Sequence, residues 1–200
     1  MEHTAWTLIG DTAIFLDIRH DRYFRLPPAG NAQFVSALEI PAGGWPVQPP
    51  GFERPGTWAP PASRSPLIDS GPFNLGDVAR AIWMQKRVER RLNSRPFMTV
   101  MSDLAGLSAS KPLADPSSDA MAARMVRAFE LARLLRSAAD RCLARSIALA
   151  LCLMRRRCAV QVVLGVKLSP FSAHCWVQSG EHVLNDSLEE VQRYSPILVL

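Results

Sequence analysis

A cysteine, a histidine and an aspartate in the last third of the chain could act together in nucleophilic catalysis. Cys142 opens a Leu- and Ala-rich run, and His174 and Asp186 lie in two extended runs on either side of a short turn. A thiolate is a strong nucleophile, an imidazole can take up the proton of a thiol, and a carboxylate can orient the imidazole. The three residues are therefore candidates for a nucleophile, its base and the group that orients the base.

The run 142–154 is expected to form a buried helix, because it is rich in strong helix formers and is apolar almost all round after Ile147. Asp140 precedes the run and could cap the free N–H groups of its first turn. In that turn the helix dipole favours a thiolate at Cys142 over the thiol. The composition also permits one continuous helix from about Asp119 to Arg157, and the N–H group of Cys142 would then be bonded within that helix.

The other three cysteines are weaker candidates for the nucleophile. Cys175 should point to the opposite face of its strand from His174, Cys152 lies in the middle of the apolar run, and Cys158 lies at a helix-to-strand junction. Cys142 alone follows a helix start. The alternative is that all four are small buried apolar residues, which is the usual role of a free cysteine.

Three extended runs follow the helix. The run 159–168 is β-branched and short, and 172–178 and 182–186 flank a turn, which predicts a strand and then a β-hairpin. In a hairpin with a three-residue loop, the residue numbers of facing positions have a constant sum, so His174 should face Asp186. The Cβ atoms of such a pair lie about 4.5–5.5 Å apart, within hydrogen-bonding reach of an imidazole and a carboxylate.

No metal or cofactor is expected from the motifs. The chain has no Gly-rich phosphate loop, no HExxH sequence and no paired Cys/His zinc spacing. A metal site made by His174, Cys175 and His182 is not expected, because strand alternation sends the first two residues to opposite faces.

Four segments between Cys142 and Asp186 together carry a family resemblance. They are Cys142-Leu-Ala-Arg-Ser, Val163-Leu-Gly-Val-Lys, Pro170-Phe-Ser-Ala-His174-Cys-Trp-Val and Val183-Leu-Asn-Asp186. Their order resembles the B proteins of lasso peptide biosynthesis, transglutaminase-like cysteine proteases that remove the leader from a precursor peptide. The resemblance is close from about residue 140 to 186 and looser upstream to about residue 73. It implies a catalytic triad of Cys142, His174 and Asp186 in an α+β, transglutaminase-like (papain-like) core, where a helical bundle packs on an antiparallel sheet.

The first forty residues carry a second resemblance. Three β-prone runs at 6–9, 13–18 and 23–26, separated by turn residues, predict a small three-stranded antiparallel meander, and a helix should follow from about Asn31 to Glu39. This pattern resembles the PqqD-like leader-recognition element, in which an exposed edge strand adds the leader peptide as a further strand. The alternative is a packing unit of the protease. The resemblance implies leader binding by Arg22, Tyr23, Phe24, Arg25 and Leu26.

These patterns divide the chain into a leader-recognition element (1–40), a connector (41–72) and a protease domain (73–200). The connector contains nine of the sixteen prolines, a density that disfavours regular helix and central strand. Trp45 and Trp58 are expected to anchor it by packing. In the protease domain we further expect helices at 74–92, at 97–104 and from residue 118 or 119, and a final edge strand at 194–200.

The composition of the chain indicates its class of protein and the compartment in which we expect it. The chain is 48% hydrophobic and 20% charged, which is typical of a globular protein with a substantial core. It has no apolar run long enough to span a membrane and no signal-peptide pattern at its start, so we expect a cytoplasmic protein with reduced cysteines. Its net charge of +5 is spread over several Arg-rich segments, which disfavours nucleic-acid binding.

The two resemblances together predict a leader peptidase. It would bind the leader of a ribosomal lasso precursor peptide, hydrolyse the leader/core bond and pass the core to an ATP-dependent, asparagine-synthetase-like cyclase. The oxyanion would be bound by the backbone N–H of Cys142 and by one further donor. Two alternatives remain: a transglutaminase-like acyl transferase that uses the same triad, and a non-catalytic leader-binding adaptor that uses only the N-terminal strands.

Overall fold

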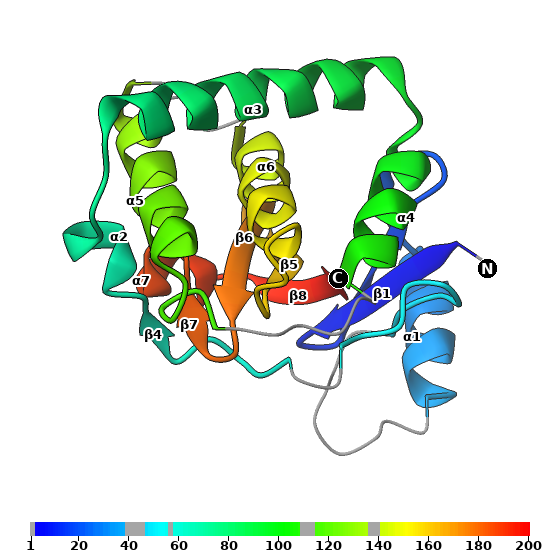
Figure 1. The fold of residues 1–200 in the computed structure, drawn as a ribbon. Coiled ribbons are helices and arrows are strands. Elements are labelled where there is room, and N and C mark those ends of the chain that lie inside the picture. Colours follow the sequence, from blue (N-terminus) through cyan, green and yellow to red (C-terminus); the bar gives the residue numbers. More distant parts are fainter. Residues whose placement is uncertain (1–2, 39–46, 56–57, 109–114, 136–140) are drawn as a thin grey trace.

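The computed structural model describes residues 3–38, 47–55, 58–108, 115–135 and 141–200. The described helices are α1 (Pro28–Ser36), α2 (Leu67–Ser70), α3 (Leu75–Ser94), α4 (Phe97–Ser108), α5 (Ala120–Leu135), α6 (Cys142–Met154) and α7 (Leu188–Val191). The described strands are β1 (Thr4–Ile9), β2 (Thr12–Asp17), β3 (Arg22–Arg25), β4 (Ser63–Arg64), β5 (Gln161–Leu168), β6 (Phe171–Ser179), β7 (His182–Val183) and β8 (Ser195–Val199). The α+β class expected from the sequence is confirmed (Figure 1).

The larger sheet has the strand order β4-β7-β6-β5-β8, and all its pairs are antiparallel except β4 with β7. Helix α6 packs on one face, over Val162, Leu164 and Val177. A second apolar cluster around Trp176 and Trp58 covers the other face. Burial on both faces explains why β5 is a continuous apolar run. The last strand, β8, lies at an edge of this sheet as expected.

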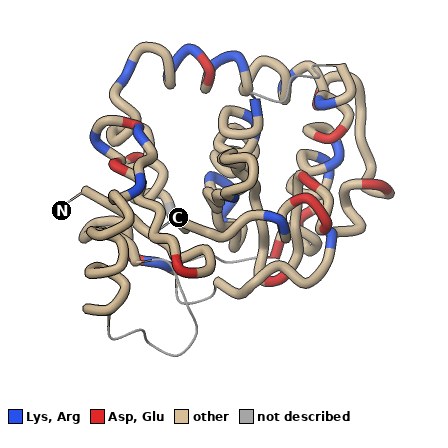
Figure 2. The backbone as a smooth tube through the Cα atoms, turned by 180° about the vertical axis from the view of Figure 1, so that it is seen from behind, with Lys and Arg blue, Asp and Glu red and all other residues tan. Residues whose placement is uncertain are grey.

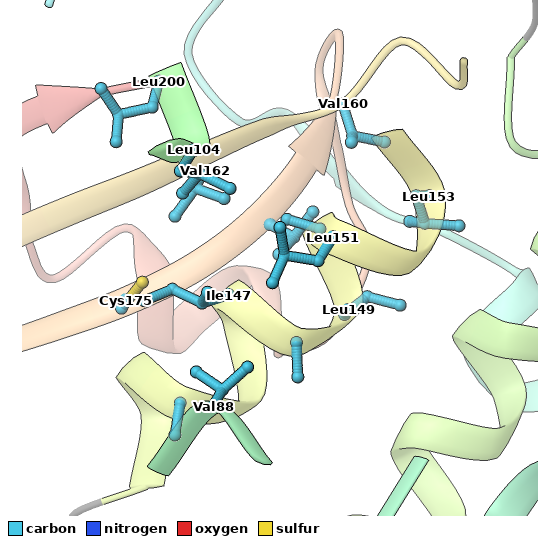
Figure 3. Close-up of a cluster of buried hydrophobic side chains, with 14 of the residues drawn as sticks. Val88, Leu104, Ile147, Leu149, Leu151, Leu153, Val160, Val162, Cys175 and Leu200 are labelled. Atoms are coloured by element: carbon cyan, nitrogen blue, oxygen red, sulfur yellow. The ribbon is translucent and has the colours of Figure 1, made fainter. Parts of the chain in front are cut away.

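Helix α6 is the centre of the main core. The apolar side chains along it meet α3, α4 and the sheet, as Figure 3 shows for Val88, Leu104, Ile147, Leu149, Leu151, Leu153 and Val162. Helix α5 lies beside α6 (Figure 1), and Arg141 directly before α6 has a non-helical backbone, so the alternative of one continuous helix from 119 to 157 is wrong. The N-cap residue of α6 is Arg141, without a side-chain cap bond, whereas Asp140 lies outside the described residues. The prediction that Cys142 lies in the first turn is confirmed.

Two other helices begin where polar residues can cap them. The side chain of Asn74 accepts a hydrogen bond from the N–H of Asp77 at the start of α3, and Asp119 accepts from two N–H groups at the start of α5. The predicted helix at 97–104 runs four residues further, to Ser108. Within the described residues, none of the helices is long and apolar enough to cross a bilayer. Figure 2 shows basic residues spread over several of these helices, with fewer acidic residues among them.

The N-terminal sheet has the order β1-β2-β3, and its two faces pack differently. On one face, Trp6 and Phe15 contact Phe34 of α1, at ring-centroid distances of 5.1 and 5.2 Å. On the other face, Ile14 and Leu16 are fully buried in the same apolar core as α6. The N-terminal sheet and the rest of the chain therefore share one core, while the boundaries at residues 40 and 72 stay predictions.

Helix α1 begins earlier than expected. Its first residue is Pro28 and not Asn31, because proline suits the first helical position, where its missing N–H is not needed. The side chain of Asn31 instead accepts from the N–H of Ala13 and donates to the carbonyl of Asp11, which holds α1 on the turn between β1 and β2. The expected helix end, Glu39, lies outside the described residues.

The Pro-rich connector is more regular than its composition suggested. It contains the short edge strand β4 and the single helical turn α2, because an edge strand and a helix start both tolerate nearby prolines. Trp58 is 8% exposed and packs in the cluster of Trp176, as expected of an anchor. Trp45 lies outside the described residues.

Gly165 of β5 allows an unusually close approach of side chains to the sheet. A Cβ atom at this position would lie 2.8 Å from the ring of Trp176 and 2.8 Å from the Cβ of Tyr194. We expect Gly165→Ala to lower the free energy of unfolding by about 1–3 kcal/mol, since the two aromatic residues must move away. Urea denaturation measures this change. Gly106→Ala is the control, because Gly106 lies in α4 with no atom near its added Cβ, and a loss of stability there as large as at Gly165 would contradict the argument.

Candidate active site

Cys142, His174 and Asp186 come together although they lie on three different elements. Cys142 is the first residue of α6, His174 lies in the middle of β6, and Asp186 follows β7. The Nε2 atom of His174 lies 2.9 Å from Oδ2 of Asp186. Cys142 lines the same cleft as His174 and lies close enough for the imidazole to lower the pKa of its thiol. The order thiol, imidazole, carboxylate is the arrangement that nucleophilic catalysis by a cysteine needs.

The strand register expected for the hairpin is wrong by one residue. Ser179 pairs with His182 and Gln178 with Val183, so that the loop has two residues and begins with Gly180 at φ +53°. Glycine favours this tighter turn because it takes a positive φ without strain. The pairing ends at Val183, so His174 and Asp186 are not a facing pair of strand residues. Asp186 reaches the imidazole from the segment that follows β7.

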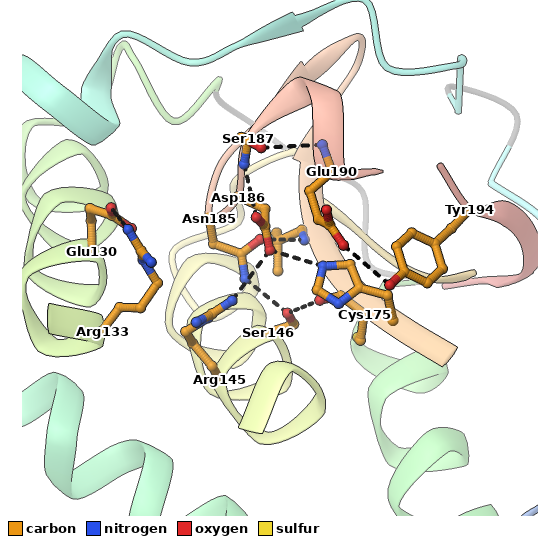
Figure 4. Close-up of polar contacts among 12 residues, drawn as sticks. Glu130, Arg133, Arg145, Ser146, Cys175, Asn185, Asp186, Ser187, Glu190 and Tyr194 are labelled. Carbon is orange, nitrogen blue, oxygen red and sulfur yellow. Dashed lines mark hydrogen bonds and ion pairs between the residues drawn. The ribbon is translucent and has the colours of Figure 1, made fainter. Parts of the chain in front are cut away.

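A buried amide takes the place of strand pairing after Val183. Asn185 accepts a hydrogen bond from the backbone N–H of Val177 and donates to the hydroxyl of Ser146 on α6. Ser146 in turn donates to the carbonyl of Cys175, the neighbour of His174 (Figure 4). Asn185 and Ser146 are almost completely buried. This network ties α6, β6 and the segment that carries Asp186 into one unit.

The carboxylate of Asp186 is surrounded by donors. Besides His174, Oδ2 accepts from Nη2 of Arg145 at 3.3 Å, and Oδ1 accepts from the backbone N–H of Ser187. Burial alone would raise the pKa of Asp186, but the hydrogen bonds from His174 and Ser187 and the charges of His174 and Arg145 outweigh it and lower the pKa. Asp186 is therefore ionised at neutral pH and can stabilise a positive imidazolium.

The surroundings of Cys142 favour the thiolate. Burial opposes ionisation, but the hydrogen bond and charge of His174, the backbone N–H of Cys175 and the charge of Arg145 outweigh it and lower the pKa of Cys142. The expected activation by a helix start has a physical basis, because the thiol lies in the first turn of α6, where N–H groups have no acceptor within the helix.

The imidazole is held in its charged form. Burial lowers the pKa of His174, whereas the hydrogen bonds and charges of Asp186 and Cys142 raise it by more, to about 9. The positive imidazolium in turn favours the thiolate form of Cys142. The His174 ring also packs on Tyr194, with centroids 5.0 Å apart, and Tyr194 is brought onto the sheet beside Gly165.

A cleft of about 680 Å³ opens beside the three residues. Arg133, Arg145 and Glu190 give its walls charge, and Phe97, Leu164 and Tyr194 give them apolar surface. Two further lining residues, Asp21 and Tyr23, come from the turn before β3 and from β3 itself. The N-terminal sheet therefore forms part of the wall next to Cys142.

The five residues predicted to bind a leader peptide lie on or directly after β3, which is an edge strand of its sheet. Arg22 and Arg25 are exposed, while Tyr23, Phe24 and Leu26 are partly buried. Their side chains are not on one face: Tyr23 faces the cleft, and Phe24 stacks on Phe15 at 5.0 Å, on the face that α1 covers.

The thiols of the other three cysteines are not activated. Cys175 and Cys158 are buried and Cys152 is partly buried, and burial raises the pKa of all three thiols. Among the described residues, no group of three His, Cys, Asp or Glu side chains is placed to hold a metal ion.

Sequence reasoning did not identify four residues that shape the site: Arg145, Ser146, Asn185 and Tyr194. Two of them carried a weak signal. Ser146 and Arg145 interrupt an otherwise apolar helix one turn after Cys142, where a polar side chain needs a nearby partner. Asn185 and Tyr194 carried none, because their partners are distant in sequence.

Three comparisons with known proteins were made. A family model described as the transglutaminase-like superfamily matches residues 78–199, more than half of the chain. The matched segment begins in α3, ends at β8 and contains Cys142, His174 and Asp186. Neither the curated proteins nor the solved structures gave a match.

The pKa of Cys142 can be tested by alkylation. The rate of reaction with iodoacetamide rises with pH as the thiolate forms, and the inflection of this curve reports the pKa of the thiol. Because the pKa of Cys142 is lowered, its inflection should lie at a lower pH than that of an ordinary thiol, whose pKa is about 8.5. His174→Ala removes the largest lowering influence and leaves burial, so the inflection should move to higher pH. Peptide mapping by mass spectrometry measures Cys142 and Cys152 in the same sample. Cys152 serves as the internal control, and an inflection of Cys142 that does not respond to His174→Ala would contradict the proposed contact.

Asn185 can be tested for its part in positioning Asp186. Asn185→Ala leaves the N–H of Val177 and the hydroxyl of Ser146 without their partner, which should cost about 1–3 kcal/mol of unfolding free energy. The alkylation inflection of Cys142 should also rise, because a displaced Asp186 supports the imidazolium less well. Urea denaturation and alkylation measure the two effects. Asn93→Ala on the exposed side of α3 is the matched control, and equal effects at both positions would refute the positioning role.

Proposed function

The chain belongs to the transglutaminase-like superfamily, and we propose that it is a thiol peptidase that cleaves the leader from a ribosomal precursor peptide. The superfamily fits a cysteine-protease or an acyl-transferase core. Both activities begin with the attack of a cysteine thiolate on an acyl carbon. We propose that the acyl group is a peptide carbonyl and that water is the acceptor that releases it from Cys142.

One observation carries the proposal: His174 bonds to Asp186 and interacts with Cys142, and the three residues lie beside a cleft that is walled in part by an edge strand. An edge strand can bind an extended peptide through backbone hydrogen bonds without requiring one particular sequence. A peptide added to β3 would run along the strand that contributes Tyr23 to the cleft. The proposed peptide-binding strand therefore lies beside the proposed nucleophile, Cys142.

In the first half of the reaction, the Cys142 thiolate attacks the carbonyl carbon at the leader/core junction. A C–S bond forms, and the carbonyl oxygen becomes an oxyanion within hydrogen-bonding range of the N–H groups at the start of α6. When the C–N bond breaks, His174 donates its proton to the departing amine of the core peptide. A pKa of about 9 keeps that proton available at neutral pH.

In the second half, the leader is released from the thioester. His174, now neutral, accepts a proton from water as the water oxygen attacks the thioester carbon. The C–S bond then breaks, and the thiolate and imidazolium are regenerated. Throughout, Asp186 remains ionised, holds the ring through Nε2 and stabilises its positive charge.

Leader recognition is assigned to β3, with Arg22 and Arg25 exposed on either side of the two aromatic residues. The exposed guanidinium groups favour a peptide that carries carboxylate side chains. We further propose that the released core passes to a separate asparagine-synthetase-like cyclase, as the resemblance to the lasso B proteins implies. The ATP of that step belongs to the partner.

Cys142→Ala tests the proposed function. Removing the nucleophile should reduce cleavage of a precursor peptide by about 10⁴-fold or more, without loss of leader affinity. Mass spectrometry of the purified chain incubated with the peptide encoded beside it measures cleavage, and fluorescence anisotropy of a labelled leader measures affinity. Cys152→Ala is the matched control, because it removes another partly buried thiol of the same helix, distant from His174.

Two outcomes would contradict the peptidase. An amine adduct on a glutamine-containing peptide, without chain cleavage, would identify an acyl transferase. Unchanged processing by the Cys142→Ala variant, with leader binding intact, would identify a leader-binding adaptor.

A further inference from the structure

Tyr23 enters the catalytic cleft from outside the segment that carries the triad. It faces Leu16 across the β2–β3 pair, and Leu16 is fully buried in the main core. Because directly opposed residues of a sheet share a face, Tyr23 points toward α6 and away from α1. Its ring packs against Phe171, the first residue of β6, at a centroid distance of 5.7 Å. The position of Tyr23 is thus determined by strand register and by an aromatic contact.

The phenol group of Tyr23 differs from that of the other tyrosine in the cleft. The hydroxyl of Tyr194 donates to Oε1 of Glu190 at 3.2 Å. For Tyr23, no hydrogen bond of the hydroxyl is found among the residues that the structure describes. Tyr23 is partly buried and lines the same cleft as Cys142, so its hydroxyl is within reach of water in the cleft. A substrate oxygen that displaces this water can accept the hydrogen bond of the phenol.

The electrostatic surroundings keep this hydroxyl protonated. Burial raises the pKa of Tyr23, and the charges of Cys175, Asp21 and Cys142 raise it further. Tyr23 is therefore a hydrogen-bond donor over the whole working range of pH and cannot act as a base. Tyr23 and Cys142 line the same cleft.

We propose that the hydroxyl of Tyr23 is the second donor to the oxyanion, beside the backbone N–H of Cys142. This inference rests on the proposed function, since it assumes attack of Cys142 on a carbonyl carbon. As the tetrahedral intermediate forms, negative charge develops on the former carbonyl oxygen, and the Tyr23 O–H bond to it strengthens. The hydroxyl keeps its proton throughout, and the bond weakens again when the C–N bond breaks.

Strand β3 of the N-terminal sheet then has two roles, peptide binding and stabilisation of the oxyanion. The free edge of β3 is available to a peptide backbone, and the same strand supplies a donor to the transition state. A peptide that binds along β3 stabilises the strand next to Cys142.

Tyr23→Phe in the full chain tests the inference. The substitution keeps the ring and its contact with Phe171 and removes only the hydroxyl. The acylation rate of Cys142 by the precursor peptide, measured in a single turnover, should fall by about 10²–10³-fold. KM and leader affinity should change by less than about threefold, because the bond forms mainly in the transition state. Trp6→Phe, which trims an aromatic side chain on the α1 face of the same sheet, should leave the rate unchanged.

The acylation step is shared by a peptidase and an acyl transferase, so it separates this inference from the proposed function. A slow Tyr23→Phe variant supports the oxyanion role even if the final acceptor proves to be an amine. A normal acylation rate overturns it while leaving the peptidase intact. An increase in KM without a fall in the acylation rate also overturns the inference, because Tyr23 would then be a binding residue. A parallel fall in the iodoacetamide reactivity of Cys142 also overturns it, because Tyr23 would then act on the thiol and not on the substrate.

Discussion

The hydrogen bond between His174 and Asp186 is the interaction on which the site depends. It fixes the orientation of the imidazole, and together with the Cys142 contact it raises the pKa of the ring to about 9. The side chains of His174 and Asp186 are 13% and 18% exposed, so water screens the pair weakly. Strand pairing does not make this contact, since β7 ends three residues earlier. The buried amide of Asn185 holds the carboxylate in place instead.

The central helix and the sheet serve that interaction from opposite sides. Helix α6 is buried along most of its length, which fixes the position of its first residue, Cys142, relative to the strands. Ser146 then bonds the helix to the backbone of β6, one residue from His174. On the other face of the sheet, Gly165 lets Tyr194 and Trp176 pack closely, and Tyr194 supports the imidazole ring. Packing and chemistry therefore use the same few residues.

The N-terminal strands are integrated with the site in space. They share the apolar core with α6, and β3 contributes to the wall of the cleft. Their number, their order and the turn chemistry between them were predictable, because period-two patterns and turn residues are local signals. That Tyr23 lines the same cleft as Cys142 was not predictable, since it depends on how two sheets far apart in the chain pack together.

The sequence alone determined the helix that begins at Cys142, the apolar strands that follow it and the presence of His174 and Asp186 on adjacent segments. These features follow from local propensity, from alternation and from the residue types that the chemistry needs. Only the tertiary structure decided the two-residue turn, the support of Asp186 by Asn185 and Arg145, and the place of Tyr23 at the cleft. The support of Asp186 and the place of Tyr23 depend on contacts between separate elements of the fold, and no local pattern encodes which side chain will fill a buried polar position.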